Sequence, residues 1–295
     1  MHTTPSSFPS GKRALVLGGG GAAGNAWLIG VLAGMSESGL DVTDADLIVG
    51  TSAGATTAAQ ITGATPAELF SAVLAAAPPH RRAGGAGPMF DQLERTGRII
   101  AASRDAADMR SRMGAAALEL AGAPDRSGSE RWRAMVAGRL SRQDWPDRRL
   151  LVTAVDAETG EPVAFDRSSG VELVDAVAAS TAGGPAYSIG DAWYIDGGYR
   201  SNADNADLAA GYERVLVLSP LGGRTRFPME WGMHLEAQVD ALRSGGSRVE
   251  TVFPDADSLA AFGENMMDLS AREPAARAGY AQGTALAGKL TALWR

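Results

Sequence analysis

The sequence lacks cysteine, contains only three histidines and has no long apolar run. The absence of cysteine excludes disulfides and thiolate metal sites. The histidines are scattered and form no HExxH pattern, so we expect neither a metal nor another cofactor. No stretch approaches the roughly 20 apolar residues of a spanning helix. Residues 1–11 are polar, without the apolar core of a signal peptide, so we expect a flexible N-terminal segment and a cytoplasmic protein.

An excess of positive charge is also missing. The chain carries 27 Lys and Arg against 34 Asp and Glu, a net charge of −7 at pH 7. This balance argues against nucleic acid as a partner and against general attraction to anionic membranes. Local peripheral contact with a membrane stays open, because the middle of the chain is its most basic part. Its arginines there include Arg81, Arg82, Arg104, Arg110, Arg112, Arg126, Arg131 and Arg133.

The sequence does contain the pattern GTSAG at residues 50–54, which places Ser52 directly after the apolar run 47–49. A strand, a serine between small residues and a following helix are typical of a nucleophile elbow. In such an elbow the serine is strained, and larger neighbours than Gly50 and Gly54 would collide with the adjoining strand and helix. In a chain with 37 glycines this pattern is weak by itself, so its value depends on its context.

A second pattern, GGGGAAG at residues 18–24, follows a strand predicted over residues 14–17 and precedes a predicted amphipathic helix. This arrangement is typical of an anion site, because backbone N–H groups at a helix N-terminus converge on a phosphate or on an oxyanion. The loop also satisfies the dinucleotide pattern GxGxxG. Nucleotide binding is the less favoured interpretation, since the second strand lacks the acidic residue for the ribose and no Walker-type Lys follows.

A third pattern, Asp196-Gly197-Gly198, follows a strand predicted over residues 193–195. It sets a carboxylate at a strand end, although Asp-Gly alone indicates only a turn. In this order, the glycine loop, GTSAG and Asp-Gly-Gly resemble the patatin-like phospholipase family. The similarity covers about residues 14–63 and 150–218, including ASTAGGPAYSIG at residues 179–190.

The resemblance implies a catalytic dyad in which Ser52 is the nucleophile and Asp196 the general base. It implies a lipid acyl hydrolase, phospholipase A-like, that cleaves a lipid or other carboxylic ester through an acyl-enzyme. An acyltransferase with the same dyad and a non-catalytic regulatory module are the alternatives. The remaining implied site residues are the oxyanion-hole glycines Gly18, Gly19, Gly20 and Gly21, and the supporting glycines Gly50, Gly54, Gly197 and Gly198.

Two departures from common hydrolase patterns shape this expectation. The family often carries a basic residue where this chain has Ala23, so neutral esters or another acyl donor stay open beside phospholipids. A triad in α/β-hydrolase order would need a histidine after the acid, and His234 alone has that position. We expect His234 to open a helix rather than to act as a base. A dyad then needs a carboxylate made more basic by burial.

Alternating strand and helix patterns favour a mostly parallel sheet covered on both faces, and the resemblance implies the same three-layer α/β/α fold. We expect one domain over residues 12–295, with a hairpin turning at Thr159 and Gly160. Strands are predicted at residues 215–218 and 249–253 and a helix at residues 271–294. Asn202 or Asn205 is expected to cap a helix at residues 206–210, and Asn202 lies close enough in sequence to orient Asp196.

Residues 78–147 form a predicted helical insertion between the elbow and the next core strand. It is expected either to act as a cap whose apolar side chains meet a lipid chain, or to pack on the core as an ordinary helical pair. The side chains in question are Met109, Met113, Leu118 and Leu120.

Overall fold

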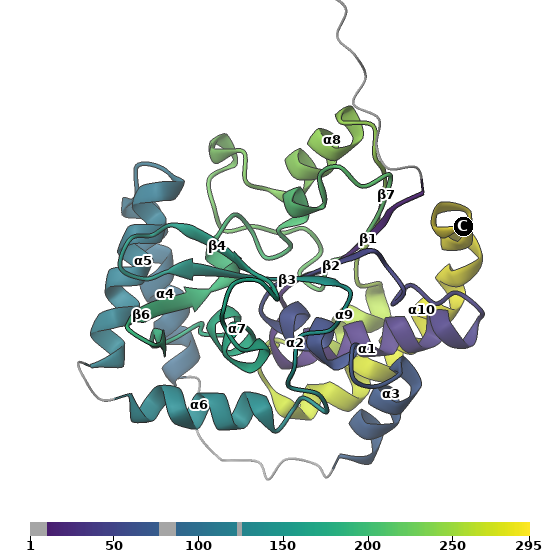
Figure 1. Cartoon of the computed structure of the whole chain (residues 1–295), viewed down its shortest axis with the longest axis horizontal. Coiled ribbons are helices and arrows are strands. Elements are labelled where there is room, and N and C mark those ends of the chain that lie inside the picture. Colours follow the sequence, from purple (N-terminus) through teal and green to yellow (C-terminus); the bar gives the residue numbers. More distant parts are fainter. Residues whose placement is uncertain (1–10, 77–86, 123–125) are drawn as a thin grey trace, which may run out of the picture.

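The centre of the protein is an eight-stranded sheet in the order β5-β6-β3-β2-β1-β7-β8, with β4 paired to β3 (Figure 1). The computed structural model describes residues 11–76, 87–122 and 126–295. Strands β1, β2, β7 and β8 pair in parallel, as do β2 and β3, whereas β4, β5 and β6 pair antiparallel. The strands are β1 (Arg13–Leu17), β2 (Leu47–Gly50), β3 (Arg149–Asp156), β4 (Pro162–Phe165), β5 (Tyr187–Ile189), β6 (Ala192–Asp196), β7 (Arg214–Leu218) and β8 (Arg248–Val252).

Strand β1 shows why the sheet is covered on both faces. Successive side chains of a strand point to opposite faces. Leu15 and Leu17 belong to the larger apolar core. Ala14 and Val16 belong to a second core on the other face. The predicted three-layer α/β/α arrangement with a mostly parallel sheet is therefore confirmed.

The larger core lies between the sheet and a layer of helices that includes both early and late segments of the chain (Figure 1). The two longest, α1 and α10, approach so closely that a Cβ added at Gly34 would lie 2.1 Å from Tyr280 O. One added at Gly283 would lie 2.2 Å from Val31 O. The helices of this layer are α1 (Gly21–Glu37), α2 (Ala53–Gln60), α3 (Pro66–Ala75), α7 (Leu173–Ser180), α9 (Ala256–Phe262) and α10 (Arg272–Trp294).

The second core is covered by α8 (Leu235–Ser244) and by the short 3-10 helix η2 (Ala206–Ala209). Leu235 and Val239 of α8 and Ala206 of η2 are buried in this core. The helix predicted at residues 206–210 therefore exists as a 3-10 turn. The hairpin from β3 to β4, the strands β7 and β8 and the long C-terminal helix are confirmed.

The insertion contributes α4 (Gly87–Ala102), α5 (Ala106–Ala121) and α6 (Ser127–Ala137). Met109 and Met113 are buried against Ile195 in a third core, and Leu118 packs on it. Leu120 is exposed. Two alternatives were expected for the insertion, a cap or a helical pair packed on the core. Met109 and Met113 of α5 do pack on the core. Residues 78–86 and 123–125 of the insertion lie outside the described residues, as do residues 1–10 of the expected flexible segment. That residues 78–147 act as a cap stays a prediction.

Within the described part of the chain, no helix combines the length and the apolar character needed to cross a bilayer.

Candidate active site

Ser52 lies on the sharp turn between β2 and α2 and has φ 52° and ψ −113°. A positive φ is strained for any residue other than glycine and is common at functional sites. The strain is maintained by close packing, because a Cβ at Gly54 would lie 1.9 Å from Leu17 O. The Ser52 N–H donates to Ser180 Oγ at 2.9 Å. The turn thus has the strand, strained serine and helix that the GTSAG pattern predicts.

Asp196 reaches Ser52 because β3 continues beyond the end of β2. Gly50, the last residue of β2, pairs with Val152, whereas Asp196 pairs with Ala154 further along β3. The end of the antiparallel strand β6 therefore lies beside the serine turn. The carboxylate accepts a hydrogen bond from Gly198 N at 2.8 Å and is within hydrogen-bonding reach of the Ser52 side chain.

The environment of Asp196 makes its carboxylate more basic than usual. Burial raises its pKa to about 6, against the opposing effects of the Gly198 N–H and the Ser52 side chain. Desolvation disfavours the charged form of a carboxyl group, while donated hydrogen bonds favour it. At neutral pH most of the carboxylate is still ionised, so it is both available and unusually able to accept a proton.

Asn205 connects the serine turn to the aspartate loop. Its fully buried side chain donates from Nδ2 to Thr51 Oγ1 at 2.9 Å and to Gly197 O at 3.0 Å. Its own φ is 54°, the only other positive value at a described non-glycine residue besides Ser52. Although Asn205 occupies the N-cap position of η2, its side chain makes no capping hydrogen bond. The expectation that Asn205 caps this helix is therefore wrong, because its side chain turns inward to the strand ends.

Asn202 shapes its own turn instead of orienting Asp196. Its Oδ1 accepts from the N–H groups of Asp204 and Asn205 at 2.7 and 2.8 Å, and its Nδ2 donates to Met233 O. The first two bonds close an Asx-type turn. The aspartate loop is thus braced by Asn205 and the turn after it by Asn202.

The glycine loop presents fewer free donors than its sequence predicts. Gly18 N donates to Leu218 O at 3.0 Å and Gly19 N to Ala203 O at 2.7 Å, so both amides are already used. Among the described residues no acceptor is found for the N–H groups of Gly20 and Gly21 at the start of α1. The same holds for Ala53 N, at the start of α2. Of the four glycines expected to form an oxyanion hole, Gly20 and Gly21 therefore keep N–H groups without an acceptor in the described part of the chain, as does Ala53, which the sequence patterns did not indicate. That these N–H groups bind an oxyanion stays a prediction.

A second buried carboxylate, Asp204, lies against the glycine loop. Its Oδ1 has no hydrogen-bond partner among the described residues, and a Cβ at Gly18 would lie 2.2 Å from this atom. Burial raises the pKa of Asp204 to about 7, against the opposing hydrogen bond with Ser219. Asp204 thus fills the space behind the loop and is not part of the cavity lining.

Ser52 and Asp196 open into a cavity of about 1050 Å³. Its apolar wall is suited to a hydrocarbon chain, whereas its cationic groups come from the segment just after α6, from the start of α10 and from the segment after β7. The apolar lining residues include Ala22, Ala53, Val73, Leu93, Trp132, Met267 and Leu269, and the cationic ones are Arg139, Arg226 and Arg272. Nothing in the sequence patterns singled out these arginines, because they become neighbours only through the tertiary fold.

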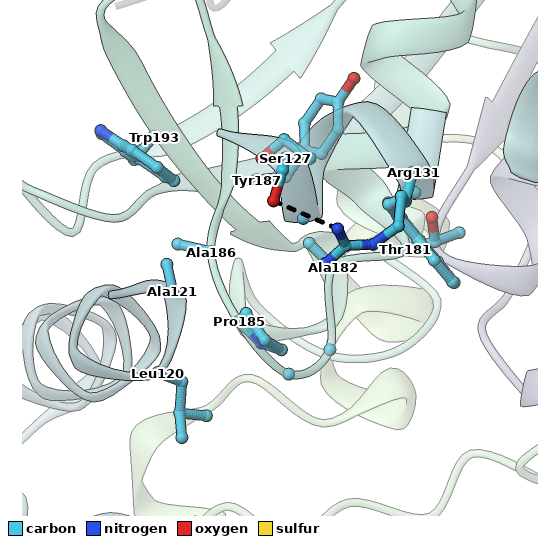
Figure 2. A pocket seen from close by; sticks show the side chains of 15 residues that line it. Leu120, Ala121, Ser127, Arg131, Thr181, Ala182, Pro185, Ala186, Tyr187 and Trp193 are labelled. Carbon is cyan, nitrogen blue, oxygen red and sulfur yellow. Dashed lines mark hydrogen bonds between the residues drawn. The ribbon is translucent and has the colours of Figure 1, made fainter. Parts of the chain in front are cut away.

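A smaller pocket of about 360 Å³ adjoins the cavity. Figure 2 shows Leu120 at the end of α5 on one side and Ser127 and Arg131 at the start of α6 on the other. Arg131 Nη1 donates to Ser127 Oγ at 3.1 Å. Trp132 and Gly183 line both spaces. Residues of α4, α5 and α6 therefore line these two spaces, although α5 also packs on the third core.

His234 precedes α8 as expected and does not line the cavity of Ser52. His2 and His80, like Arg81 and Arg82, lie outside the described residues. In the described part of the chain, no cluster of three or more His, Asp or Glu side chains could hold a metal ion.

Among curated proteins no sequence matches this chain significantly. The chain is similar to the crystal structure of VipD from Legionella pneumophila, at 14% identity and a TM-score of 0.44, covering 95% of this chain and 67% of VipD. It is also similar to the crystal structure of the type III effector protein ExoU, at 12% identity and a TM-score of 0.40, covering 96% of this chain and 54% of ExoU.

The profile of the patatin-like phospholipase family matches residues 15–209. This range runs from β1 to η2 and contains the glycine loop, Ser52 and Asp196. Because it spans more than half of the chain, the chain belongs to the patatin-like phospholipase family, a membership that supports lipid hydrolysis as its class of activity.

Proposed function

We propose that this protein is a serine acyl hydrolase of lipid esters, with Ser52 as nucleophile and Asp196 as general base. The observation that carries the proposal is the pairing of a strained serine with a carboxylate of raised pKa, within hydrogen-bonding reach of each other and on one cavity. Nucleophilic serines are activated by an adjacent base of this kind.

The reaction begins when the ester carbonyl carbon meets Ser52 Oγ. Asp196 takes the hydroxyl proton as the Oγ–C bond forms, and the carbonyl oxygen becomes an oxyanion. The N–H groups of Gly20, Gly21 and Ala53 are the candidate donors for this charge. Each well-placed donor is worth about 3 kcal/mol at the transition state. The C–O ester bond then breaks, and the leaving alcohol takes the proton from Asp196.

Hydrolysis of the acyl-enzyme uses the same two side chains, with water in the place that Ser52 had in the first half. Asp196 takes a proton from water, the hydroxide oxygen bonds to the acyl carbon, and the C–Oγ bond breaks. The proton returns to Ser52 and the fatty acid leaves. One carboxylate serves as base and acid in both halves. Asn205 and Gly198 position this carboxylate and its loop through their hydrogen bonds.

Substitution of the two proposed catalytic residues tests this function. Ser52→Ala and Asp196→Asn are each expected to lower kcat for ester hydrolysis by about 10³-fold or more. Asp191→Asn is the matched control, because Asp191 lies close in sequence to Asp196 and its side chain is fully exposed. Circular dichroism and thermal melting verify that each variant folds. Turnover retained in Ser52→Ala or in Asp196→Asn contradicts the dyad.

Two further measurements distinguish the alternative functions. Labelling of Ser52 by a fluorophosphonate probe is expected, and its absence in the folded wild type would favour a non-catalytic binding module. Product analysis with added alcohol acceptors separates hydrolysis from acyl transfer, since both proceed through the same acyl-enzyme. Free fatty acid as the main product supports hydrolysis.

A further inference from the structure

The smaller pocket of about 360 Å³ meets the Ser52 cavity at the loop between α7 and β5, residues 181–186. Gly183 and Gly184 of this loop line both spaces. A Cβ added at Gly183 would lie 3.7 Å from Asp196 Oδ2, which is ordinary van der Waals contact. The smaller pocket therefore begins beside the carboxylate of the proposed general base.

Hydrogen bonds hold this loop at both ends. Near its start, Ala182 O accepts from Asp196 N at 3.0 Å, which ties the loop to β6. At its end, Ala186 N donates to Ala117 O of α5, also at 3.0 Å. The junction between the two spaces is therefore a fixed feature of the fold.

Neither the backbone nor the packing requires glycine at positions 183 and 184. Both residues lack a positive φ. Gly54 admits a neighbouring backbone, since its Cβ would lie 1.9 Å from Leu17 O, but Gly183 and Gly184 do not. No described atom lies within 4 Å of a Cβ added at Gly184, and only side-chain atoms do so at Gly183. What the two glycines provide is open space at the junction, where a ligand can approach the backbone.

The groups on the ester carbonyl carbon have different requirements in the proposed reaction. The carbonyl oxygen needs N–H donors, and the candidates Gly21 and Ala53 line the Ser52 cavity but not the smaller pocket. The leaving alcohol oxygen needs the proton of Asp196 and therefore lies within hydrogen-bonding distance of that carboxyl group. The alcohol is thus directed to the side of Gly183, where the smaller pocket begins, and the acyl chain keeps the Ser52 cavity.

The walls of the smaller pocket are mostly apolar (Figure 2). Its apolar lining residues include Leu120, Ala121, Trp132, Pro185, Ala186 and Trp193. Among the described residues that line it, Arg131 alone is charged. Its volume lies near the lower end of the roughly 300–1,000 Å³ that is typical of sites for small organic ligands. Such a pocket favours an uncharged hydrocarbon group of moderate size.

We propose that the smaller pocket binds the hydrocarbon part of the leaving alcohol, and that Gly183 and Gly184 keep the way to it open. The proposal rests on the proposed hydrolase function and adds which side of the ester is selected there. Each methylene of the alcohol that enters the pocket is expected to raise kcat/KM about fourfold. Because the alcohol leaves before the acyl-enzyme is hydrolysed, its length affects acylation and not the second half of the reaction.

Two isomeric esters test this assignment. Octyl butyrate carries its long chain on the alcohol and ethyl decanoate carries it on the acyl group, so the two have the same composition. The kcat/KM of each is divided by that of ethyl butyrate, the short reference. In Gly184→Leu, whose side chain takes up the open space at the junction, the ratio for octyl butyrate is expected to fall about tenfold or more. The ratio for ethyl decanoate is expected to stay within about twofold of the wild type.

A second substitution acts on the wall of the pocket instead of the junction. Leu120→Gln makes the end of α5 polar at similar size and is expected to lower the ratio for octyl butyrate about threefold or more. Leu259→Gln and Gly288→Leu are the matched controls. Leu259 is 47% exposed against 48% for Leu120, and no described atom lies within 4 Å of a Cβ at Gly288. Neither control residue lines the two spaces.

A binding measurement makes the test independent of turnover. In the Ser52→Ala background, the affinity for 1-octanol is measured by calorimetry with and without Gly184→Leu and Leu120→Gln. Weaker binding of 1-octanol in both double variants, with unchanged binding in the Leu259→Gln and Gly288→Leu controls, supports the alcohol site.

Circular dichroism and thermal melting verify that each variant folds. A folded Gly184→Leu protein that loses ethyl decanoate instead of octyl butyrate, loses both equally or keeps both overturns the assignment. An unchanged ratio for octyl butyrate in folded Leu120→Gln overturns it as well. If the wild type hydrolyses none of the three esters, the proposed hydrolase function fails. The affinities for 1-octanol then decide separately whether the pocket binds an alcohol, and unchanged affinities overturn the site.

Discussion

At the residue scale, Asp196 gives the proposed reaction a characteristic pH dependence. The carboxylate can accept the Ser52 proton only when it is ionised, and burial raises its pKa to about 6. We therefore expect kcat/KM to rise between pH 5 and pH 7 with a midpoint near 6, and activity to be lost as the pH falls below that value. Initial rates with a soluble ester, whose own ionisation is constant over this range, measure the profile. A rate that is independent of pH from 5 to 7 contradicts the assignment of Asp196 as base.

Asp204 should make stability depend on pH in the same range. Its folded pKa of about 7 exceeds the roughly 4 of an unfolded aspartate. The contribution to stability is therefore fully present below about pH 4 and is lost as the pH rises through about 7, by at most about 4 kcal/mol. Asp204→Asn stays neutral throughout, so we expect its melting temperature to exceed that of the wild type more at pH 8 than at pH 5.

Melting curves at the two pH values measure this difference directly. Asp191→Asn, which removes a fully exposed carboxylate, serves as the control and should leave the pH dependence of the melting temperature unchanged. An Asp204→Asn protein with the same pH dependence as the wild type would show that Asp204 is ionised in the folded protein.

The sequence identifies residues best where the backbone dictates the residue type. Gly54 is required by the approach of Leu17 O, and such local constraints leave a readable motif around Ser52. The role of Asn205 leaves no such motif, because its contacts are with Thr51 and Gly197, far apart in sequence. Arg272 is equally invisible, since its place in the cavity depends on how α10 packs.

At the scale of elements, the contact of α1 with α10 depends on glycine. A Cβ at Gly283 would lie 2.2 Å from Val31 O, a backbone atom that cannot move without shifting α1. We expect Gly283→Ala to lower the free energy of unfolding by about 1–3 kcal/mol. Gly288 lies on the same helix with nothing near its missing Cβ, so Gly288→Ala should instead raise it by up to about 1 kcal/mol.

Urea denaturation of both alanine variants measures these opposite changes. Because both substitutions add the same methyl group to the same helix, the helix propensity of alanine cancels in the comparison. Equal stabilisation by the two substitutions would mean that α1 and α10 are further apart than described.

The contact between α1 and α10 also shows what the sequence could not predict about the arrangement of helices. The alanine-rich segment 271–294 predicts a helix, and the helix is present as α10. Its partner could not be predicted, because Gly30, Gly34 and Gly283 read in sequence as weak helix residues, and only the structure shows that they admit another backbone. The strand β6 was likewise predicted, but not its antiparallel pairing with β3.

At the scale of the whole molecule, residues 15–209, which match the family profile, do not contain all the strands of the sheet. Strand β1 pairs with β2 on one side and with β7 on the other, and β7 begins at Arg214, beyond residue 209. Helix α1 loses its partner α10 with the same cut. We expect a fragment of residues 11–209 to lack a cooperative thermal transition, because it would expose apolar faces of β1 and α1.

Circular dichroism melting of this fragment beside the full chain tests the expectation. A sharp transition of the fragment, close to that of the full chain, would show that β7, β8 and α10 are dispensable for folding. The order of the three motifs and the alternation of strands and helices were sufficient to predict the layers. They could not predict which late segments complete the sheet and the cavity, since those contacts are set by packing between distant parts of the chain.

The proposed oxyanion donors are main-chain N–H groups, so a change of side chain cannot test them one by one. Ordinary mutagenesis cannot delete the N–H of Gly20, and Gly20→Ala would first collide with Pro220, whose Cβ lies 2.6 Å from the added atom. Loss of activity in that variant would therefore report displacement of the loop and not loss of a donor. Semisynthesis with glycolic acid in place of Gly20 or Gly21 exchanges the amide for an ester and removes the hydrogen-bond donor without adding a side chain.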